Sequence, residues 1–171
     1  MYTRVLVFAA ALAACGGSSS NLTNPGQSQS CTVTLSGAVT GTFDCKPATT
    51  AWSSSNNQGG FTFSVGSGSG TTAAPSITVA IGVTGEPQAK TYHSTDSGVS
   101  AGLTVSTGSS SVWFAQAPSN GSFALTFSSV SNAQTATSNG VTGKVYDGEG
   151  TLTATLKSAT GGADVTLSAT F

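Results

Sequence analysis

Three cysteines are the most reactive side chains in this chain of 171 residues, and they stand in two different settings. A thiol can carry a covalent group, pair in a disulfide or hold a metal ion, and its surroundings decide which. Cys15 ends an apolar run and begins a stretch rich in Gly and Ser. Cys31 and Cys45 instead bracket the alternating segment CTVTLSGAVTGTFDC. The two settings indicate two different uses.

The residues before Cys15 have the parts of an export signal. Arg4 supplies a positive charge near the start, and residues 5–14 form an unbroken apolar run that ends in LAA. This run is too short to cross a bilayer, which takes roughly 20 residues. The pattern resembles the bacterial lipobox, in which the signal is cut just before a cysteine that carries lipid. The alternative is an ordinary secretory signal with an incidental cysteine.

The lipobox resemblance implies an order of segments: residues 1–14 as a signal peptide, 15–30 as the lipidated Cys15 with a flexible tether, and 31–171 as one domain. The tether has almost no apolar residues. Membrane lipid, attached through Cys15, is the implied partner, and the bacterial cell envelope is the implied location. Gly16 stands where an aspartate retains many enteric lipoproteins at the inner membrane, which favours the outer membrane.

Cys31 and Cys45 cannot bond if their segment is one straight strand, because its ends would lie roughly 45 Å apart. An exported chain meets an oxidising compartment, and lipidation of Cys15 would leave an even number of thiols. We therefore expect a disulfide across a hairpin, with two free buried thiols as the alternative. The register of that hairpin pairs Cys31 with Cys45, Val33 with Phe43 and Leu35 with Gly41.

Charged residues are scarce in this chain. Five Lys or Arg and six Asp or Glu make up 6% of it and leave a net charge of −1, whereas typical proteins are about a quarter charged. Without a basic face the chain is not expected to bind nucleic acid. Solubility must come from Ser, Thr, Asn and Gly.

Apolar and polar residues alternate through most of the domain, which is the period of a strand with one buried face. Val112 and Phe114 form one such run, and a hairpin turn is expected at residues 147–150 (DGEG), with further turns at Asn120-Gly121 and Asn139-Gly140. We expect an all-β fold, an antiparallel two-sheet β-sandwich of about eight or nine strands, with a small closed barrel as the alternative. The expected core comprises Phe61, Phe63, Ile77, Val79, Ile81, Leu103, Phe123, Leu125, Phe127, Leu152, Leu156, Val165 and Leu167.

Few residues could perform catalysis. His93 is the single histidine, and Ser94 and Asp96 lie beside it, yet the sequence has no nucleophile elbow of the G-x-S-x-G type. We therefore expect no catalytic residue and interpret His93 as a solvated loop residue. Asp147 and Glu149 could suggest calcium, but their spacing lacks the EF-hand pattern. No metal site and no cofactor are expected.

Aromatic residues leave two alternatives open. Trp52, Trp113 and Phe114 could stack on a sugar, although core packing is the simpler expectation. Trp113 and Phe114 are adjacent on a strand, so one of them should be buried. A last strand ending in Phe171 resembles the C-terminal signal of outer-membrane barrels, whose outer face is apolar.

The domain as a whole resembles the small β-rich lipoproteins that bacteria encode in number, through the lipobox, the Cys31–Cys45 hairpin and the strands GSFALTFSSV, GTLTATLKS and DVTLSATF. No activity follows from this resemblance. We expect a membrane-anchored lipoprotein of structural or binding role, not an enzyme, whose ligand or envelope partner (a protein or a polysaccharide) is unknown. The alternatives are a carbohydrate-binding module or hydrolase using residues such as His93 or Trp113, and an outer-membrane β-barrel.

Overall fold

The computed structural model describes residues 30–45, 49–66, 74–108, 111–117 and 120–171. Within these ranges the chain forms eleven antiparallel strands, and none of the described residues belongs to a helix that could span a membrane. The strands are β1 (Cys31–Gly37), β2 (Gly41–Cys45), β3 (Thr49–Ser53), β4 (Gln58–Val65), β5 (Ser76–Thr84), β6 (Thr91–His93), β7 (Val99–Thr107), β8 (Ser111–Ala117), β9 (Ser122–Ser138), β10 (Val141–Ser158) and β11 (Val165–Thr170).

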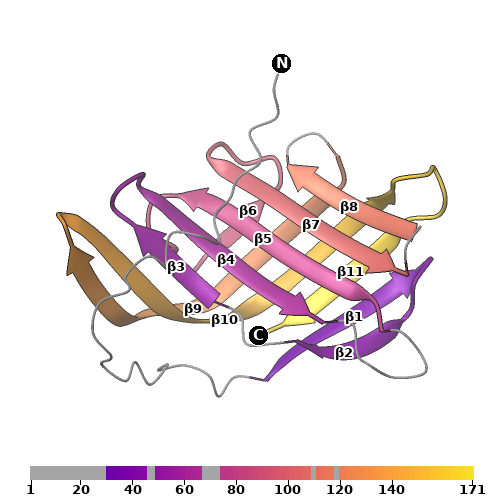
Figure 1. The fold of residues 1–171 in the computed structure, drawn as a ribbon, viewed down its shortest axis with the longest axis horizontal. Helices are drawn as coiled ribbons and strands as arrows, with labels where there is room; N and C mark the ends of the chain where they lie inside the picture. The colour runs from indigo at the N-terminus through magenta and orange to yellow at the C-terminus, as the bar shows by residue number, and fades with distance from the viewer. Residues whose placement is uncertain (1–29, 46–48, 67–73, 109–110, 118–119) are drawn as a thin grey trace.

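The strands form two layers that face each other across one core (Figure 1). One layer has the order β2-β1-β11-β10-β9-β6, and the other has the order β3-β4-β5-β7-β8. The strands of the two layers cross steeply, as they do in orthogonally packed sandwiches. The all-β sandwich is confirmed. It has more strands than expected because the short β3 and β6 give no clear apolar alternation.

β10 belongs to both layers. Residues 143–146 pair with β3, and Lys157 and Ser158 pair with β8. Between these two contacts, residues 151–155 pair with β9 on one side and β11 on the other. Corners of orthogonal sandwiches are made by strands that bend from one sheet into the other. β10 forms two such corners and so connects the layers.

The turn expected at residues 147–150 is wrong, because these residues lie inside β10. The turn expected at Asn139-Gly140 is confirmed: these two residues join β9 to β10, and both have positive φ, as a two-residue hairpin turn requires. The pairing of β10 with β9 shifts register between Glu149 and Gly150, where Ser128 is skipped, which marks a bulge in β9 opposite these residues. Glycines and acidic residues that look like a turn in the sequence therefore mark a bend within a strand.

Gly150 stands where β10 bends closely against its neighbours. A Cβ added at this position would overlap the backbone oxygen of Thr126 and would lie 3.0 Å from the ring of Phe171. Gly150 and Phe171 also exchange two backbone hydrogen bonds, with N···O distances of 2.8 and 3.1 Å. The bend therefore requires a residue without a side chain.

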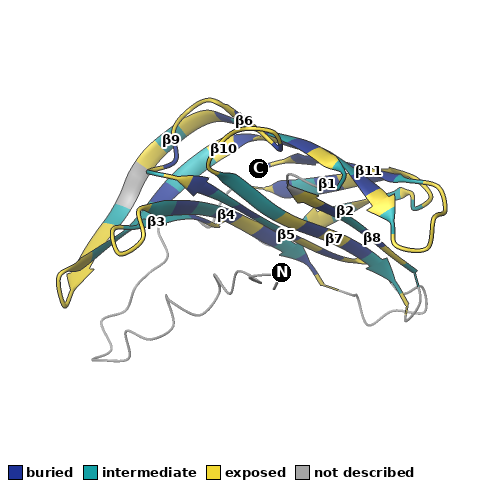
Figure 2. Cartoon of the chain, turned by 90° about the horizontal axis from the view of Figure 1, so that it is seen from above, coloured by how far each residue is buried: buried dark blue, intermediate teal, exposed yellow. Residues whose placement is uncertain are grey.

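The core lies between the two layers, and every residue expected in it is buried. Buried and exposed positions alternate along the strands in Figure 2. Aromatic rings join the layers at the centre: the ring centroid of Phe61 from β4 lies 5.6 Å from that of Phe127 on β9 and 4.4 Å from that of Phe171. Such aromatic contacts add to the free energy gained from apolar burial.

In β8 the residues that point inward are not Val112 and Phe114, which the apolar alternation predicted, but their neighbours in the sequence. Val112 is 38% exposed and Phe114 is half buried, whereas Trp113 and Ala115 are buried. The indole Nε1 of Trp113 donates a hydrogen bond to the carbonyl of Ala163 at 2.8 Å. Apolar residues occur on both faces of this strand, so alternation alone could not choose between them. Trp113 can be buried because its one polar group is satisfied.

The cysteine hairpin has the expected register and bond. Cys31 and Cys45 form a disulfide with their Cα atoms 5.0 Å apart, and β1 pairs Val33 with Phe43 on the same face. A loop of about 15 residues closed in this way contributes roughly 3 kcal/mol to stability. The bond fastens β2 to the edge of its layer.

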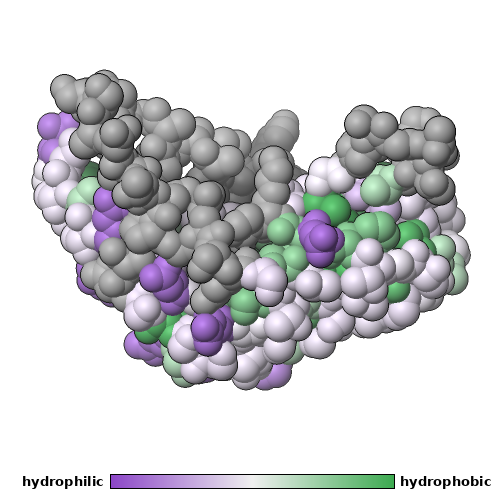
Figure 3. Space-filling model, turned by 90° about the horizontal axis from the view of Figure 1, so that it is seen from below, coloured by the Kyte–Doolittle hydropathy of each residue, from purple (hydrophilic) through white to green (hydrophobic). Residues whose placement is uncertain are grey.

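Threonines stand in rows on the solvent face of the layer that contains β10. Opposed pairs run across five strands through Thr91, Thr126, Thr151, Thr170 and Thr32. Cross-strand threonine pairs stabilise a sheet modestly through hydroxyl contacts; the hydroxyl oxygens of Thr91 and Thr126 lie 2.9 Å apart. On the face of the molecule in Figure 3, the described surface is mostly pale with green hydrophobic areas, and strongly hydrophilic residues are isolated. Hydroxyl groups thus supply much of the surface polarity that charged residues supply in typical proteins.

Because only one face of β9 is buried, substitutions at neighbouring residues should change the free energy of unfolding by different amounts. Leu125→Ala should lower the free energy of unfolding by about 2–5 kcal/mol, because it leaves a cavity in the core. Thr126→Ala removes only a partly exposed hydroxyl bonded to Thr91, and should cost about 1 kcal/mol or less. Urea unfolding of both variants measures the difference. Equal losses would contradict the assigned faces.

The close approach at the β10 bend predicts that replacing Gly150 lowers stability more than replacing a glycine that has free space around it. Gly150→Ala should destabilise the fold by about 1–3 kcal/mol or more, since the new methyl group overlaps backbone atoms. Gly102→Ala on β7 is the matched control, because a Cβ there meets no atom within 4 Å. Thermal unfolding should show a lower melting temperature for the first variant alone. A Gly150→Ala variant as stable as the wild type would refute the close approach.

Candidate functional site

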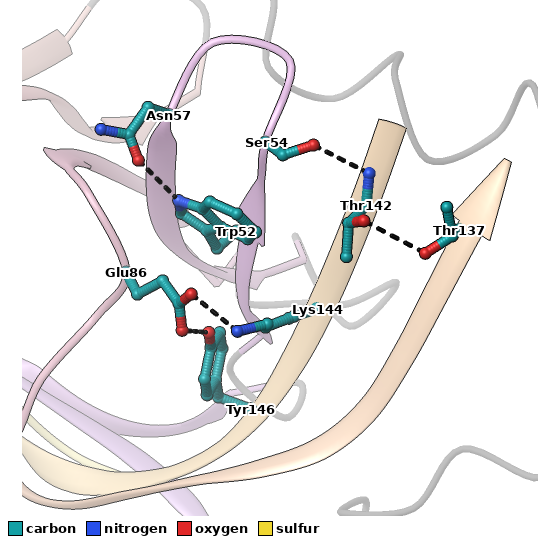
Figure 4. A network of polar contacts seen from close by, with 8 residues as sticks. All are labelled: Trp52, Ser54, Asn57, Glu86, Thr137, Thr142, Lys144 and Tyr146. Carbon is teal, nitrogen blue, oxygen red and sulfur yellow. Dashed lines mark hydrogen bonds and ion pairs between the residues drawn. The ribbon is translucent and has the colours of Figure 1, made fainter. Parts of the chain in front are cut away.

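Five polar and aromatic side chains gather where β3 pairs with β10 (Figure 4). We name them the β3–β10 cluster: Trp52, Asn57, Glu86, Lys144 and Tyr146. They come from three separate parts of the chain, which are β3 and the turn after it, the connection between β5 and β6, and the first half of β10.

The pairing of β3 with its neighbours turns the cluster toward the inner side of the sheet. Trp52 stands directly opposite Lys144, and Thr50 stands opposite Tyr146. On its other side Trp52 faces Gly59, which shares a face with the buried phenylalanines of β4. Directly opposed residues of antiparallel strands point to the same face. The cluster therefore continues the inner face past the end of the apolar core.

Glu86 reaches the cluster from a connection that is held on both sides. The N–H of Gly85 donates to the carbonyl of Asn57 at 2.8 Å, and the N–H of Gln88 donates to the hydroxyl of Tyr92 at 2.9 Å. These two bonds fix the backbone just before and just after Glu86.

Gly59 allows this connection to lie close to β4. A Cβ at Gly59 would come within 2.8 Å of both the carbonyl oxygen of Gly85 and the ring of Pro87. A side chain at this position would force the connection that carries Glu86 to shift. Gly59 in β4 therefore helps to position the side chain of Glu86, which lies 27 residues later (86 − 59) in the sequence.

The Glu86 carboxylate is the centre of the polar contacts. Its Oε1 lies 2.6 Å from Nζ of Lys144, and its Oε2 accepts a hydrogen bond from the Tyr146 hydroxyl at 2.5 Å. Nζ of Lys144 also lies 5.2 Å from the ring centroid of Trp52, within the range of a cation–π contact. The Trp52 Nε1 donates to Oδ1 of Asn57 at 3.3 Å. Each side chain therefore contacts at least one other member.

The contacts stabilise opposite charges on Glu86 and Lys144. A hydrogen bond from Lys144, and a second, weaker contribution from the hydroxyl of Tyr146, hold the pKa of Glu86 below its ordinary value. Burial, together with the neighbouring carboxylate, raises the pKa of Tyr146, so its hydroxyl keeps the proton that it donates. At neutral pH the cluster offers a carboxylate, an ammonium group, an amide and an indole, which are groups suited to binding.

The residues weighed for catalysis are placed differently. His93 is exposed, and its backbone N–H, not its imidazole, donates to Oδ2 of Asp96 at 2.7 Å. Ser94 is buried, and its N–H donates to the carbonyl of Phe123. The three neighbours thus engage the backbone and do not form a proton relay with one another.

Glu149, in the β10 bend, lines a shallow depression of about 550 Å³. The Ser129 hydroxyl contacts Oε2 of Glu149 at 3.4 Å, and the Ser128 hydroxyl donates to the Glu149 carbonyl. Among the described residues, no three His, Cys, Asp or Glu side chains gather as a metal site would require. The depression is lined by Ser30, Thr126, Ser128, Glu149, Gly150, Thr151, Thr170 and Phe171.

The sequence pointed to only one member of the cluster. Trp52 was a candidate for sugar stacking and is partly exposed, whereas Trp113, the other candidate indole, is buried. The sequence did not indicate Lys144 and Tyr146, because Val141 and Val145 suggest that the other face of this strand points inward. The available signal was that Lys144 and Tyr146 lie two residues apart, because this spacing places two side chains on the same face of a strand. Cys15, the expected lipidation site, lies outside the described residues.

Comparison with known proteins identifies no relative: no family model, curated protein or solved structure matches this chain.

The lowered pKa of Glu86 predicts an acid-dependent loss of stability. A group whose pKa is depressed on folding contributes stability above its unfolded value, here 4.5, and this contribution is lost as the pH falls through the folded value. Glu86→Gln cannot make this contribution, so its stability should fall less than that of the wild type between about pH 6 and pH 3. Urea midpoints across this range measure the effect. Identical pH profiles would show that the carboxylate is not held by Lys144 and Tyr146.

Proposed function

We propose that this chain is a lipid-anchored protein of the bacterial cell envelope whose β-sandwich binds a ligand and performs no reaction. The observation that carries the proposal is the disulfide between Cys31 and Cys45 at the start of the described domain. Disulfides persist in oxidising compartments outside the cytoplasm. The bond therefore supports export, which the signal-like residues 1–14 also predict.

The anchor in this proposal is Cys15, which follows a lipobox-like sequence. The sixteen positions from Cys15 to Cys31 (31 − 15) could reach roughly 50 Å when extended. This is long enough to hold the domain clear of a membrane surface. By the same resemblance, Gly16 favours the outer membrane, and the chain fits the group of small β-rich bacterial lipoproteins.

A binding role is supported by the β3–β10 cluster, in which charged and aromatic groups remain partly open to solvent. A hydrolase that uses His93 has no comparable support, because Asp96 binds the backbone and Ser94 is buried. A sugar-binding module is the second candidate. It is supported by the partly exposed indole of Trp52 and not by Trp113.

Lipidation of Cys15 is the direct test of the anchor. Mass spectrometry of the mature protein should show an acylated cysteine at its N-terminus, and Cys15→Ala should remain an uncut precursor or leave the membrane fraction. Ser18→Ala, three residues further on, is the matched control and should be processed normally. Wild-type protein with an unmodified Cys15 in a membrane-free fraction would overturn the anchor.

A further inference from the structure

We propose that the β3–β10 cluster is a binding site for an uncharged saccharide. The inference rests on the binding role proposed above and adds the chemical class of the ligand. A saccharide presents hydroxyl groups that donate and accept hydrogen bonds, and a face of C–H groups that packs on aromatic rings. Binding sites of this kind combine an aromatic surface with a few well-placed polar groups. The cluster brings both together within one small area (Figure 4).

Trp52 supplies the aromatic surface. Its ring is partly exposed at the end of the sandwich, whereas the ring of Trp113 is buried and bonded to Ala163. The Trp52 ring is held by its Nε1 contact with Asn57 and by Lys144, whose Nζ lies over one face of the ring. A large ring that is already held in place offers contact area at little entropic cost.

The polar members keep hydrogen-bonding capacity for hydroxyl groups. Lys144 has three N–H donors, of which Glu86 takes one, and the two side chains are 25% and 41% exposed. The Glu86 carboxylate has lone pairs beyond those used by Lys144 and Tyr146. The amide nitrogen of Asn57 has no partner among the described residues. Donors and acceptors thus stand on both sides of the indole.

The charges of the cluster favour a neutral ligand. Glu86 and Lys144 are the charged members, they have opposite signs, and their N···O distance is 2.6 Å. A charged ligand would be attracted to one partner and repelled by the other, and would have to disrupt the pair. A neutral hydroxyl group can donate to the carboxylate and accept from the ammonium group while the pair stays in place.

The site is organised before any ligand arrives. Trp52 and Lys144 are fixed by the strand pairing of β3 with β10, and Glu86 is held by backbone bonds from Gly85 and Gln88. Little ordering of side chains or loops is then required on binding, which favours affinity.

Affinity electrophoresis of the full, lipidated protein in mild detergent tests the inference. The gels contain one of four neutral polysaccharides (dextran, mixed-linkage β-glucan, galactomannan or arabinoxylan) or the anionic polysaccharide alginate. We expect at least one neutral polymer to retard the protein. Trp52→Ala should weaken that retardation by about tenfold or more, Trp52→Phe should retain part of it, and Asn57→Ala should weaken it too. Val112→Ala, which removes an exposed apolar side chain on β8, is the matched control and should behave as the wild type.

Two results would overturn the saccharide site: no retardation by any of the four neutral polymers, whether or not alginate retards the protein, or retardation that is unchanged in both Trp52→Phe and Asn57→Ala. Circular dichroism of each variant separates loss of binding from loss of folding, and Asn57→Ala decides the matter if Trp52→Ala unfolds. The mass of the N-terminus is measured on the same samples. Failure of the anchor is thereby distinguished from failure of the site.

Discussion

The hydrogen bonding of β10 to four other strands is the constraint on which the rest of the structure depends. β10 pairs with β9 along most of its length, with β11 and β8 in its second half and with β3 in its first half. Both layers therefore share this strand, and their relative placement follows from where it bends. Gly150 lies at that bend, against Thr126 and Phe171.

The same strand supplies both the core and the candidate site. Leu152 and Leu156 are buried after the bend, while Lys144 and Tyr146 lie on the inner face before it. Apolar side chains in the second half stabilise the sandwich, and polar ones in the first half meet Glu86 where the apolar core ends. The stability of the core and the geometry of the cluster are thus linked through one continuous backbone.

The sequence predicted those features that depend on local alternation. Leu125 and Phe127 repeat at a spacing of two, and only one face of such a strand can bury them, so the core could be predicted. The register of the Cys31–Cys45 hairpin followed from one shared face. Residues 147–150 look like a turn because glycine is common both in turns and at strand positions that another backbone approaches closely, and only the pairing with β9 decides between the two.

The β3–β10 cluster could not be predicted for a different reason. Trp52 and Lys144 are brought together by pairing between strands far apart in the sequence, and Glu86 joins them from a third segment. The alternation of apolar and polar residues within one segment does not show which distant strand that segment pairs with, least of all when the segment is as short and as weakly apolar as β3. β3 has five residues and one fully buried side chain, Thr50, so its presence was not evident.

We infer that β10 makes the two layers and the candidate site one cooperative unit, and native-state hydrogen exchange of its backbone amides is the measurement that decides this claim. Hydrogen-bonded amides near Lys144 and Tyr146 should then exchange through the same global opening as those near Leu152 and Leu156, with matching free energies and denaturant dependence. If the amides before the bend exchanged through a separate, low-energy opening while those after it stayed protected, the claim would be contradicted.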